Sequence, residues 1–191
     1  TLDRLRWTIL GALAAAHRSV KIITPYFLPD PAIISALNTA SLRGVTVEIL
    51  IPERNNIRLV QWASMAHLWQ VLERGCRVFL TPPPFDHNKL FIVDQSWVLF
   101  GSANWDPRSL RLNFEFNVEC YCPVFTERLT RWFDASRDRA REISLAEVNG
   151  RSLPVRLRDG ISDGPRRLAT SGSSNIPSSV RRGPRSLQVA S

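Results

Sequence analysis

The first 82 residues alternate between helix-like and strand-like spacing of hydrophobic side chains. Apolar residues recur every three to four positions, as in helices that pack on one face, in residues 2–17, 31–43 and 57–74. Short apolar runs typical of buried strands separate them, at residues 19–25, 45–52 and 76–82. Asp30-Pro31 marks a helix start, and Gly44 and Gly75 mark helix ends. Strands that alternate with helices predict an α/β layer architecture, with a largely mixed sheet between helical layers.

The next 60 residues are dominated by strand-like patterns. The apolar run at 90–93 and a second run at 97–103 flank a turn formed by Asp94, Gln95 and Ser96, which is typical of a hairpin. Residues 113–122 alternate polar and apolar side chains, which predicts a third strand. Residues 123–142 then return to helical spacing, with a predicted inward face formed by Phe125, Leu129, Trp132 and Phe133.

The composition changes at the end of this pattern. From residue 149 onward serine, proline, glycine and arginine dominate, and residues 151–191 hold eight arginines and two aspartates. We therefore expect one catalytic domain at 1–148 and a basic, disordered tail at 149–191. Of the net charge of +8, only +2 belongs to residues 1–150, so the charge of the folded part gives weak support for nucleic-acid binding.

Chain length and composition are those of one globular domain with a sizeable core. The 191 residues are 44% hydrophobic and 22% charged. The longest apolar run near the start, 9–16, is far shorter than the roughly 20 residues of a membrane-spanning helix, so no segment is expected to cross a bilayer. The three cysteines form no metal-binding pattern, and reduced thiols fit a cytoplasmic domain.

Residues 87–119 concentrate the reactive side chains of the chain. Because side chains two apart on a strand share a face, His87 and Lys89 project together, as do Ser102 and Asn104. Gly101 is interpreted as part of the motif scaffold, where the missing side chain allows a ligand to approach the backbone closely. An imidazole beside a fixed cation, with hydroxyl and amide donors nearby, suits attack on a phosphodiester.

The predicted chemistry uses His87 as a nucleophile that forms a phosphohistidine, while Lys89, Ser102 and Asn104 hold the phosphate oxygens. Glu115 is predicted to accept a hydrogen bond from the N–H of the His87 ring nitrogen that does not attack, and so to fix the tautomer. Neither a metal nor another cofactor is required. A buried histidine satisfied by a neighbouring carbonyl is the structural alternative for His87, and the accompanying polar residues argue against it.

Two further residues have a different expected role. Asp94 falls on the face opposite to the histidine and lies in a turn, so we interpret it as a scaffold carboxylate rather than a reactive group. Arg108 follows Asp106-Pro107, a helix-start signal, and either contacts the edge of the substrate or forms a scaffold ion pair.

These residues together resemble the signature of the phospholipase D superfamily. His87, Lys89 and Asp94 form H-x-K-x4-D, and Gly101, Ser102 and Asn104 form G-S-x-N. The segments TPYFLPD, PPPFDHNKL and GSANWDPRSLRLNFEFNVE further resemble the C-terminal half of bacterial cardiolipin synthases, over about residues 1–148. The resemblance implies that His87 forms the phosphohistidine or protonates the leaving group, that Lys89 and Asn104 bind phosphate, and that Glu115 supports the histidine.

The family resemblance implies a phosphatidyltransferase that converts two phosphatidylglycerol molecules into cardiolipin and glycerol. It also implies two H-x-K-x4-D motifs, of which this chain has one. The second is expected from a missing N-terminal half, since the chain begins at Thr1, or from a second copy in a homodimer. The expected partners are a phospholipid and a membrane surface, at the cytoplasmic face of the bacterial inner membrane through parts absent from this chain.

Other functions share the same motif. A dimeric single-motif nuclease, a phosphatidylserine synthase and a hydrolytic phospholipase D of the superfamily would keep the same site residues, because the shape of the pocket selects the acceptor. A non-catalytic membrane-docking module would not need an intact site. The weak charge of residues 1–150 makes a nucleic-acid substrate the less favoured one.

Overall fold

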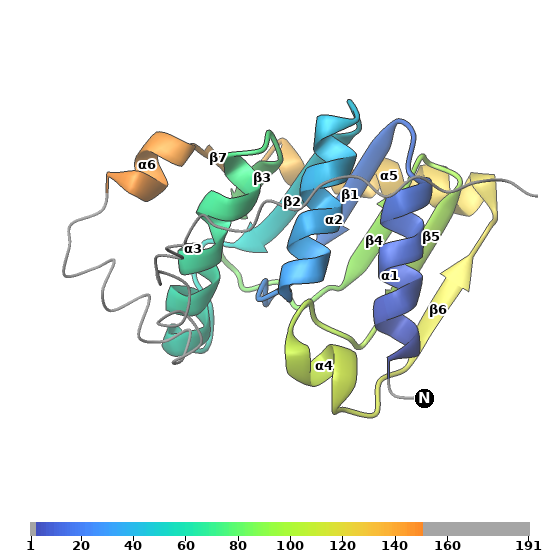
Figure 1. Cartoon of the computed structure of the whole chain (residues 1–191), viewed down its shortest axis with the longest axis horizontal. Coiled ribbons are helices and arrows are strands. Elements are labelled where there is room, and N and C mark those ends of the chain that lie inside the picture. Colours follow the sequence, from blue (N-terminus) through green and yellow to red (C-terminus); the bar gives the residue numbers. More distant parts are fainter. Residues whose placement is uncertain (1–2, 151–191) are drawn as a thin grey trace, which may run out of the picture.

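A computed structural model describes residues 3–150 of the chain. Its centre is a seven-stranded mixed sheet with the strand order β6-β5-β4-β1-β2-β3-β7. Three parallel strands form one half, namely β1 (Ser19–Ile23), β2 (Thr46–Pro52) and β3 (Arg77–Thr81). Three antiparallel strands extend it beyond β1, namely β4 (Leu90–Val93), β5 (Trp97–Gly101) and β6 (Asn117–Cys120). The predicted α/β fold with a mixed sheet between helical layers is confirmed (Figure 1).

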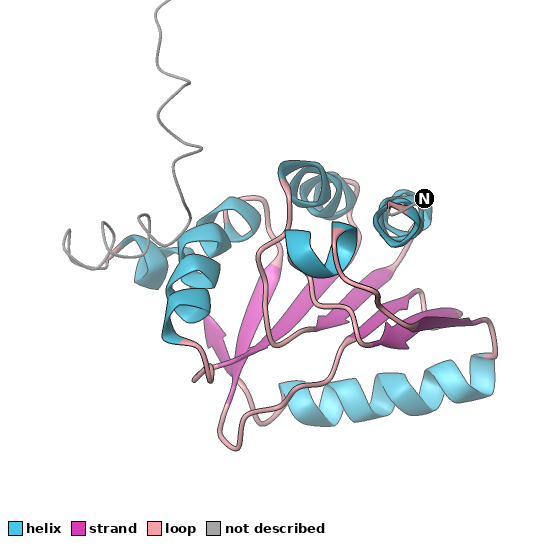
Figure 2. Cartoon of the chain, turned by 90° about the horizontal axis from the view of Figure 1, so that it is seen from below, coloured by secondary structure: helices cyan, strands magenta, loops and turns pink. Residues whose placement is uncertain are grey.

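Helices cover both faces of the sheet (Figure 2). One face is covered by α1 (Arg4–Ala15), α2 (Pro31–Leu42) and α3 (Arg58–Leu72), and the short α4 (Pro107–Arg111) lies on the same side. The other face is covered by α5 (Pro123–Arg137). Because strand side chains alternate between faces, Phe91 and Val93 join the core under α1–α3, whereas Leu90 and Ile92 join the core under α5.

The helix signals of the sequence act as expected at α2. The Asp30 side chain accepts hydrogen bonds from the backbone N–H groups of Ala32 and Ile33, with Pro31 in the first turn. Gly44, just past the helix, has a φ of 91°, a conformation that side-chain-bearing residues rarely adopt. The chain therefore leaves α2 directly into β2.

The structure differs from the predicted elements in two places. Strand β6 covers only Asn117–Cys120, so the predicted strand at 113–122 was too long. Helix α5 ends at Arg137, and the predicted continuation to residue 142 is wrong, because Arg141–Ile143 form the edge strand β7 beside β3. Ile143 is the buried residue of β7, and its charged neighbours face solvent, as suits a short edge strand.

The last described element is α6 (Leu145–Asn149), which runs across the predicted domain limit at residue 148. The predicted tail lies almost wholly outside the described residues, so the division into domain and tail stays a prediction. Within residues 3–150, no helix combines the length and apolar character that a membrane-spanning helix requires.

Candidate active site

His87 and Lys89 lie just before β4, at the end of the sheet where strands β1 and β5 finish and β4 begins. Lys89 is buried, and its Nζ donates a hydrogen bond to the backbone carbonyl of His87 at 2.6 Å. The same Nζ lies 3.0 Å from Nδ1 of the His87 ring. An ammonium group only donates hydrogen bonds, so Nδ1 accepts and the proton of the neutral ring sits on Nε2. The predicted pairing of the two side chains is thus a direct contact.

The charge of Lys89 and burial both favour a neutral imidazole. Burial, followed by repulsion from Lys89, lowers the pKa of His87, while the nearby carboxylate of Asp86 opposes the shift. Burial also lowers the pKa of Lys89, against the attraction of Glu115, Asp86 and Asp106. A histidine that attacks phosphorus must be neutral, so both effects favour the charge state that a nucleophile needs.

Exchanging the charged neighbours of His87 is expected to move its titration in opposite directions. Lys89→Met removes a repelling positive charge, so the pKa of His87 should rise and its titration midpoint should move to higher pH. Asp86→Asn removes an attracting negative charge, so the midpoint should move to lower pH. NMR titration of the His87 ring signal, assigned with His87→Ala, measures both shifts. A midpoint that moves in the same direction in both variants would contradict this electrostatic account.

Two aromatic side chains that were not predicted as site residues flank His87, which is exposed. The ring of Tyr26 meets the imidazole edge-on with the centroids 5.9 Å apart, and Phe85 lies at 5.8 Å. Tyr26 reaches this position because β1 and β4 are antiparallel with Ile23 opposite Leu90, so the residues after β1 lie beside those before β4. The strand before Tyr26 could be predicted from the sequence, but its pairing with a strand 67 residues away could not. Without that pairing, nothing in the sequence placed Tyr26 beside His87.

Ser102 and Glu115 form a second group at the same edge of the sheet. The Ser102 hydroxyl donates to the Glu115 carboxylate, and its Oγ accepts the backbone N–H of Phe116 at 2.9 Å. Glu115 also accepts a hydrogen bond from the side-chain amide of Asn113 at 3.2 Å. These bonds connect Glu115 to Ser102 rather than to the His87 ring. Its predicted support of the histidine and the predicted phosphate contact of Ser102 stay predictions.

Position 101 has to be glycine because the neighbouring backbone leaves no room for a side chain. A Cβ atom at this position would lie 2.2 Å from the backbone oxygen of Phe116 and 2.7 Å from Cα of Asn117. The sequence indicated that the missing side chain leaves room for a ligand, but the backbone at the start of β6 occupies that space. Gly101 therefore positions Ser102 against the 115–116 segment, which is a scaffold role.

Asn104 presents an amide with unused hydrogen-bonding capacity. Its Nδ2 reaches the hydroxyl of Ser109 at 3.4 Å, while its buried Oδ1 has no hydrogen-bond donor within the described residues. A buried acceptor without a partner is costly, so a ligand that donates a hydrogen bond here would be favoured. The free acceptor Oδ1 suits a donating group such as a substrate hydroxyl, whereas a phosphate oxygen, which only accepts, would have to bind Nδ2.

Asn104 also lines a cavity of about 500 Å³ beside the site. Its apolar wall consists of Leu28, Ile57, Val60 and Pro107. Its polar residues are Tyr26, Asn104, Asp106, Arg108, Ser109 and Asn113. Arg108 is an exposed residue of this lining, and its backbone N–H donates to the side chain of Asp106 at 2.8 Å. The cavity therefore places an apolar surface next to the residues predicted to bind phosphate.

Asp94 lies at the opposite end of β4 from His87. Its carboxylate accepts hydrogen bonds from the backbone N–H groups of His17, Arg18 and Ser19 at 2.7–2.8 Å. Burial opposes ionisation of this carboxyl, but the three N–H donors and Arg18 outweigh it and lower the pKa of Asp94. Asp94 thus connects the β4–β5 turn to the link between α1 and β1, away from the reactive groups.

Comparison with known proteins agrees with this arrangement. A family described as cardiolipin synthase, PLD-like domain, matches residues 9–137. The chain belongs to this family. It is 42% identical over 138 residues to cardiolipin synthase A of Pseudomonas entomophila, and 34% identical over 160 residues to the major cardiolipin synthase ClsA of Bacillus subtilis. These alignments cover 72% and 84% of this chain but 29% and 33% of the two relatives, so the chain spans about a third of their length.

Solved structures share the fold. Nuc, a phospholipase D family member from Salmonella typhimurium, superposes with a TM-score of 0.63 at 28% identity, covering 73% of this chain and 90% of Nuc. Phosphatidylserine synthase of Haemophilus influenzae superposes with a TM-score of 0.65 at 19% identity, covering 80% of this chain and 41% of that enzyme. The second likeness shows the fold alone. The sequence resemblance to phospholipase D proteins and to cardiolipin synthases is thus confirmed.

Proposed function

We propose that this chain supplies half of the active site of a phosphatidyltransferase that makes cardiolipin and glycerol from two molecules of phosphatidylglycerol. The observation that carries the proposal is the 3.0 Å contact between the His87 imidazole and the Lys89 ammonium, in a chain that belongs to the cardiolipin synthase family. The apolar cavity beside Asn104 supports a lipid substrate over a nucleic acid, because a nucleic acid offers little apolar surface to fill it.

The proposed reaction has two displacements at phosphorus. A histidine nitrogen bonds to the phosphorus of one phosphatidylglycerol, the bond to the terminal glycerol oxygen breaks, and that oxygen takes a proton as glycerol leaves. The terminal hydroxyl of a second phosphatidylglycerol then gives up its proton, attacks the phosphohistidine and releases the histidine as cardiolipin forms. Lys89 and Asn104 bind the phosphate oxygens, where negative charge increases in each transition state.

The contact with Lys89 restricts what His87 can do in the state that the structure shows. With Nδ1 accepting from Lys89, Nε2 carries the ring proton, so the neutral ring has no free nitrogen lone pair for attack. Protonating a leaving oxygen would require a second ring proton, because only the imidazolium is a strong enough acid. Attack through Nε2 requires the ring proton to move to Nδ1, where an acceptor such as Glu115 would hold it. The same side chain can therefore act as a nucleophile when it is neutral with Nε2 unprotonated, and as an acid when both ring nitrogens are protonated.

One motif is half of the catalytic machinery that this mechanism uses. The chain spans about a third of its curated relatives, so the second histidine is proposed to come from an N-terminal half of a longer protein. A second copy of this chain is the alternative source. The same longer protein is proposed to hold the site at the cytoplasmic face of the bacterial inner membrane.

The test measures lipid products and the state of His87 by mass spectrometry. The purified chain is incubated with phosphatidylglycerol in detergent, beside a His87→Ala control and a labelled DNA substrate. A chimera that joins residues 1–150 to the preceding part of the Pseudomonas entomophila relative is tested in the same way. We expect cardiolipin from the chimera, and none once His87→Ala is introduced into it.

Each outcome has a defined meaning. Cardiolipin formed by the chain alone, and dependent on His87, would mean that two copies complete the site. A folded chimera that makes cardiolipin equally well with His87→Ala would overturn the proposal.

The single-motif nuclease remains a second candidate for one reason. The chain covers 90% of Nuc, so a phospholipase D family member can be about as long as this fold alone. DNA cleaved in a His87-dependent way, with phosphatidylglycerol left intact, would favour the nuclease over the phosphatidyltransferase.

A further inference from the structure

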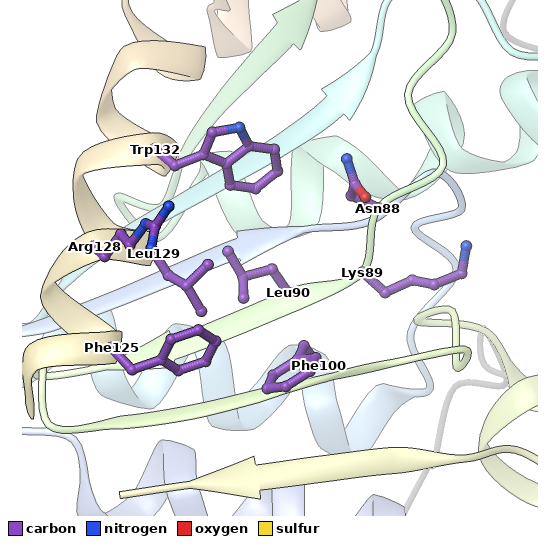
Figure 3. A pocket seen from close by; sticks show the side chains of 8 residues that line it. All are labelled: Asn88, Lys89, Leu90, Phe100, Phe125, Arg128, Leu129 and Trp132. Carbon is purple, nitrogen blue, oxygen red and sulfur yellow. The ribbon is translucent and has the colours of Figure 1, made fainter. Parts of the chain in front are cut away.

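A second cavity lies on the opposite face of the sheet, between α5 and strands β4 and β5 (Figure 3). It measures about 460 Å³, and we refer to it as the α5 groove. Its lining residues are Asn88, Lys89, Leu90, Phe100, Phe125, Arg128, Leu129 and Trp132. Leu90 and Phe100 are opposite each other in the β4–β5 ladder and form its floor.

The sequence of α5 explains why this groove stays open. The fully buried face of the helix contains Thr126, Thr130 and Phe133, which press against the sheet. The groove residues Phe125, Leu129 and Trp132 are one position earlier at each turn, so they lie along the flank of the helix. Phe125 and Trp132 keep 37% and 38% of their surface exposed. Their predicted inward packing is thus incomplete, and it leaves apolar surface facing solvent.

The guanidinium of Arg128 borders this apolar lining. Arg128 lies on the same flank of α5 as Phe125 and Leu129, and the side-chain amide of Asn88 lies across the groove from it (Figure 3). No carboxylate belongs to the lining. An apolar floor with a permanent guanidinium at its rim complements an amphiphile that has a hydrocarbon tail and an anionic head.

The groove is separate from the candidate active site but ends next to it. Lys89 lines the groove with its stem, while its ammonium points away from the other groove residues (Figure 3) and contacts His87. Asn88, on the groove side, is the residue between His87 and Lys89. Val118 of β6 is opposite Phe100 of the groove floor, and Phe116, just before β6, is 77% exposed.

We propose that the α5 groove binds one acyl chain of an anionic membrane phospholipid, with Arg128 paired to the phosphate of that lipid. Half-exposed aromatic side chains beside a basic residue are typical of protein surfaces that sit in the headgroup region of a bilayer. Docking through this groove places the start of β4, with His87 and Lys89, next to the membrane surface. The proposed site binds lipid without reacting with it, so it does not depend on the phosphatidyltransferase activity.

The test compares two charge reversals on the same helix. Arg128→Glu changes the groove, whereas Arg131→Glu makes the same change at an exposed residue that pairs with Glu127 at 3.3 Å and is not part of the lining. Co-sedimentation with vesicles of phosphatidylglycerol and phosphatidylcholine measures binding of the whole chain. We expect Arg128→Glu to weaken binding about tenfold and Arg131→Glu by at most about twofold.

A second variant fills the groove without changing charge. Leu129→Trp adds volume between Leu90 and Phe125, so we expect it to weaken vesicle binding as well, with circular dichroism as the check of folding. Phospholipids brominated in the acyl chain should quench the fluorescence of the wild-type chain more than that of Trp132→Phe. The difference reports insertion beside Trp132.

Several results would overturn the proposal. An equal loss of vesicle binding in Arg128→Glu and Arg131→Glu would show that the chain is attracted non-specifically to anionic vesicles. Unchanged binding in folded Leu129→Trp would show that the groove takes no acyl chain. Self-association that disappears in Leu129→Trp, with no vesicle binding, would assign the groove to a second copy of this chain. Because binding is measured without turnover and with His87→Ala as well, failure here is distinguishable from failure of the proposed reaction.

Discussion

Replacing Glu48 with alanine is expected to lower the free energy of unfolding by about 3–5 kcal/mol, which is the typical effect of leaving a buried charge without its partner. Glu48 is 3% exposed in the centre of the sheet and lies directly beside Lys21, which is 7% exposed. The Lys21 ammonium contacts Glu48 at 2.8 Å and Asp134 of α5 at 2.7 Å. Without Glu48, Lys21 would keep only the more exposed of its two carboxylates.

Glu48 balances two further cations. Arg77 of β3 lies 3.4 Å from Oε1 of Glu48, and Arg137 of α5 lies 3.2 Å from the same oxygen. One buried carboxylate therefore joins three strands and α5 through charged contacts. Its removal is expected to loosen α5 as well as to lower stability, because Arg137 loses a partner on the sheet.

A matched control separates burial from charge. Glu142 pairs with Arg77 at 2.8 Å, but both side chains are about half exposed, so Glu142→Ala should cost less than about 1 kcal/mol. Urea unfolding followed by circular dichroism measures both variants. A similar decrease in the free energy of unfolding in Glu48→Ala and Glu142→Ala would show that burial of the Glu48 network adds nothing to stability.

Gly101→Ala is expected to destabilise the fold by about 3 kcal/mol, at the upper end of the usual cost of overpacking. The added methyl group would lie 2.2 Å from the Phe116 carbonyl oxygen, and backbone cannot move aside as a flexible side chain does. Relief requires β6 to separate from the end of β5. That movement would break the hydrogen bonds of Ser102 to Phe116 and displace Glu115.

Replacing glycine with alanine at position 11 is expected to have the opposite effect on stability. Gly11 lies inside α1, and a Cβ atom there meets nothing within 4 Å. Gly11→Ala should raise stability by up to about 1 kcal/mol, because alanine is the better helix former. Thermal unfolding of the two variants checks the pair. Equal effects would contradict the assigned packing of Gly101 against β6.

The local pattern was sufficient for the strands and helices that bury apolar runs. Strands β1 to β5 are each a short run with little polar content, and every one of them was predicted. The segment 113–116 alternates like a strand, yet Phe114 is fully exposed in the structure. Alternation without a surface to pack on does not specify a strand. Strand β7 was missed because one buried residue, Ile143, is too weak a signal.

Site residues could be predicted where their position follows from the alternation of side chains along one strand. They could not be predicted where it depends on which strands pair with each other. His87, Lys89, Ser102 and Asn104 were selected from their spacing and lie at one edge of the sheet. Tyr26 was missed because its approach to His87 requires the antiparallel pairing of β1 with β4. The bonds of Glu115 to Ser102 and Asn113 were equally invisible, since they arise in an irregular segment.

The position of Asp94 gives the H-x-K-x4-D motif a second meaning. Between Lys89 and Asp94 lie Leu90–Val93, which are the whole of β4, so the spacing of the motif equals the length of one strand. An insertion within this interval would either turn Lys89 to the other face or pull Asp94 from the amides of residues 17–19. The spacing of the motif is therefore also a requirement of the fold. A relative that has lost catalytic activity can still keep this spacing, because the fold depends on it.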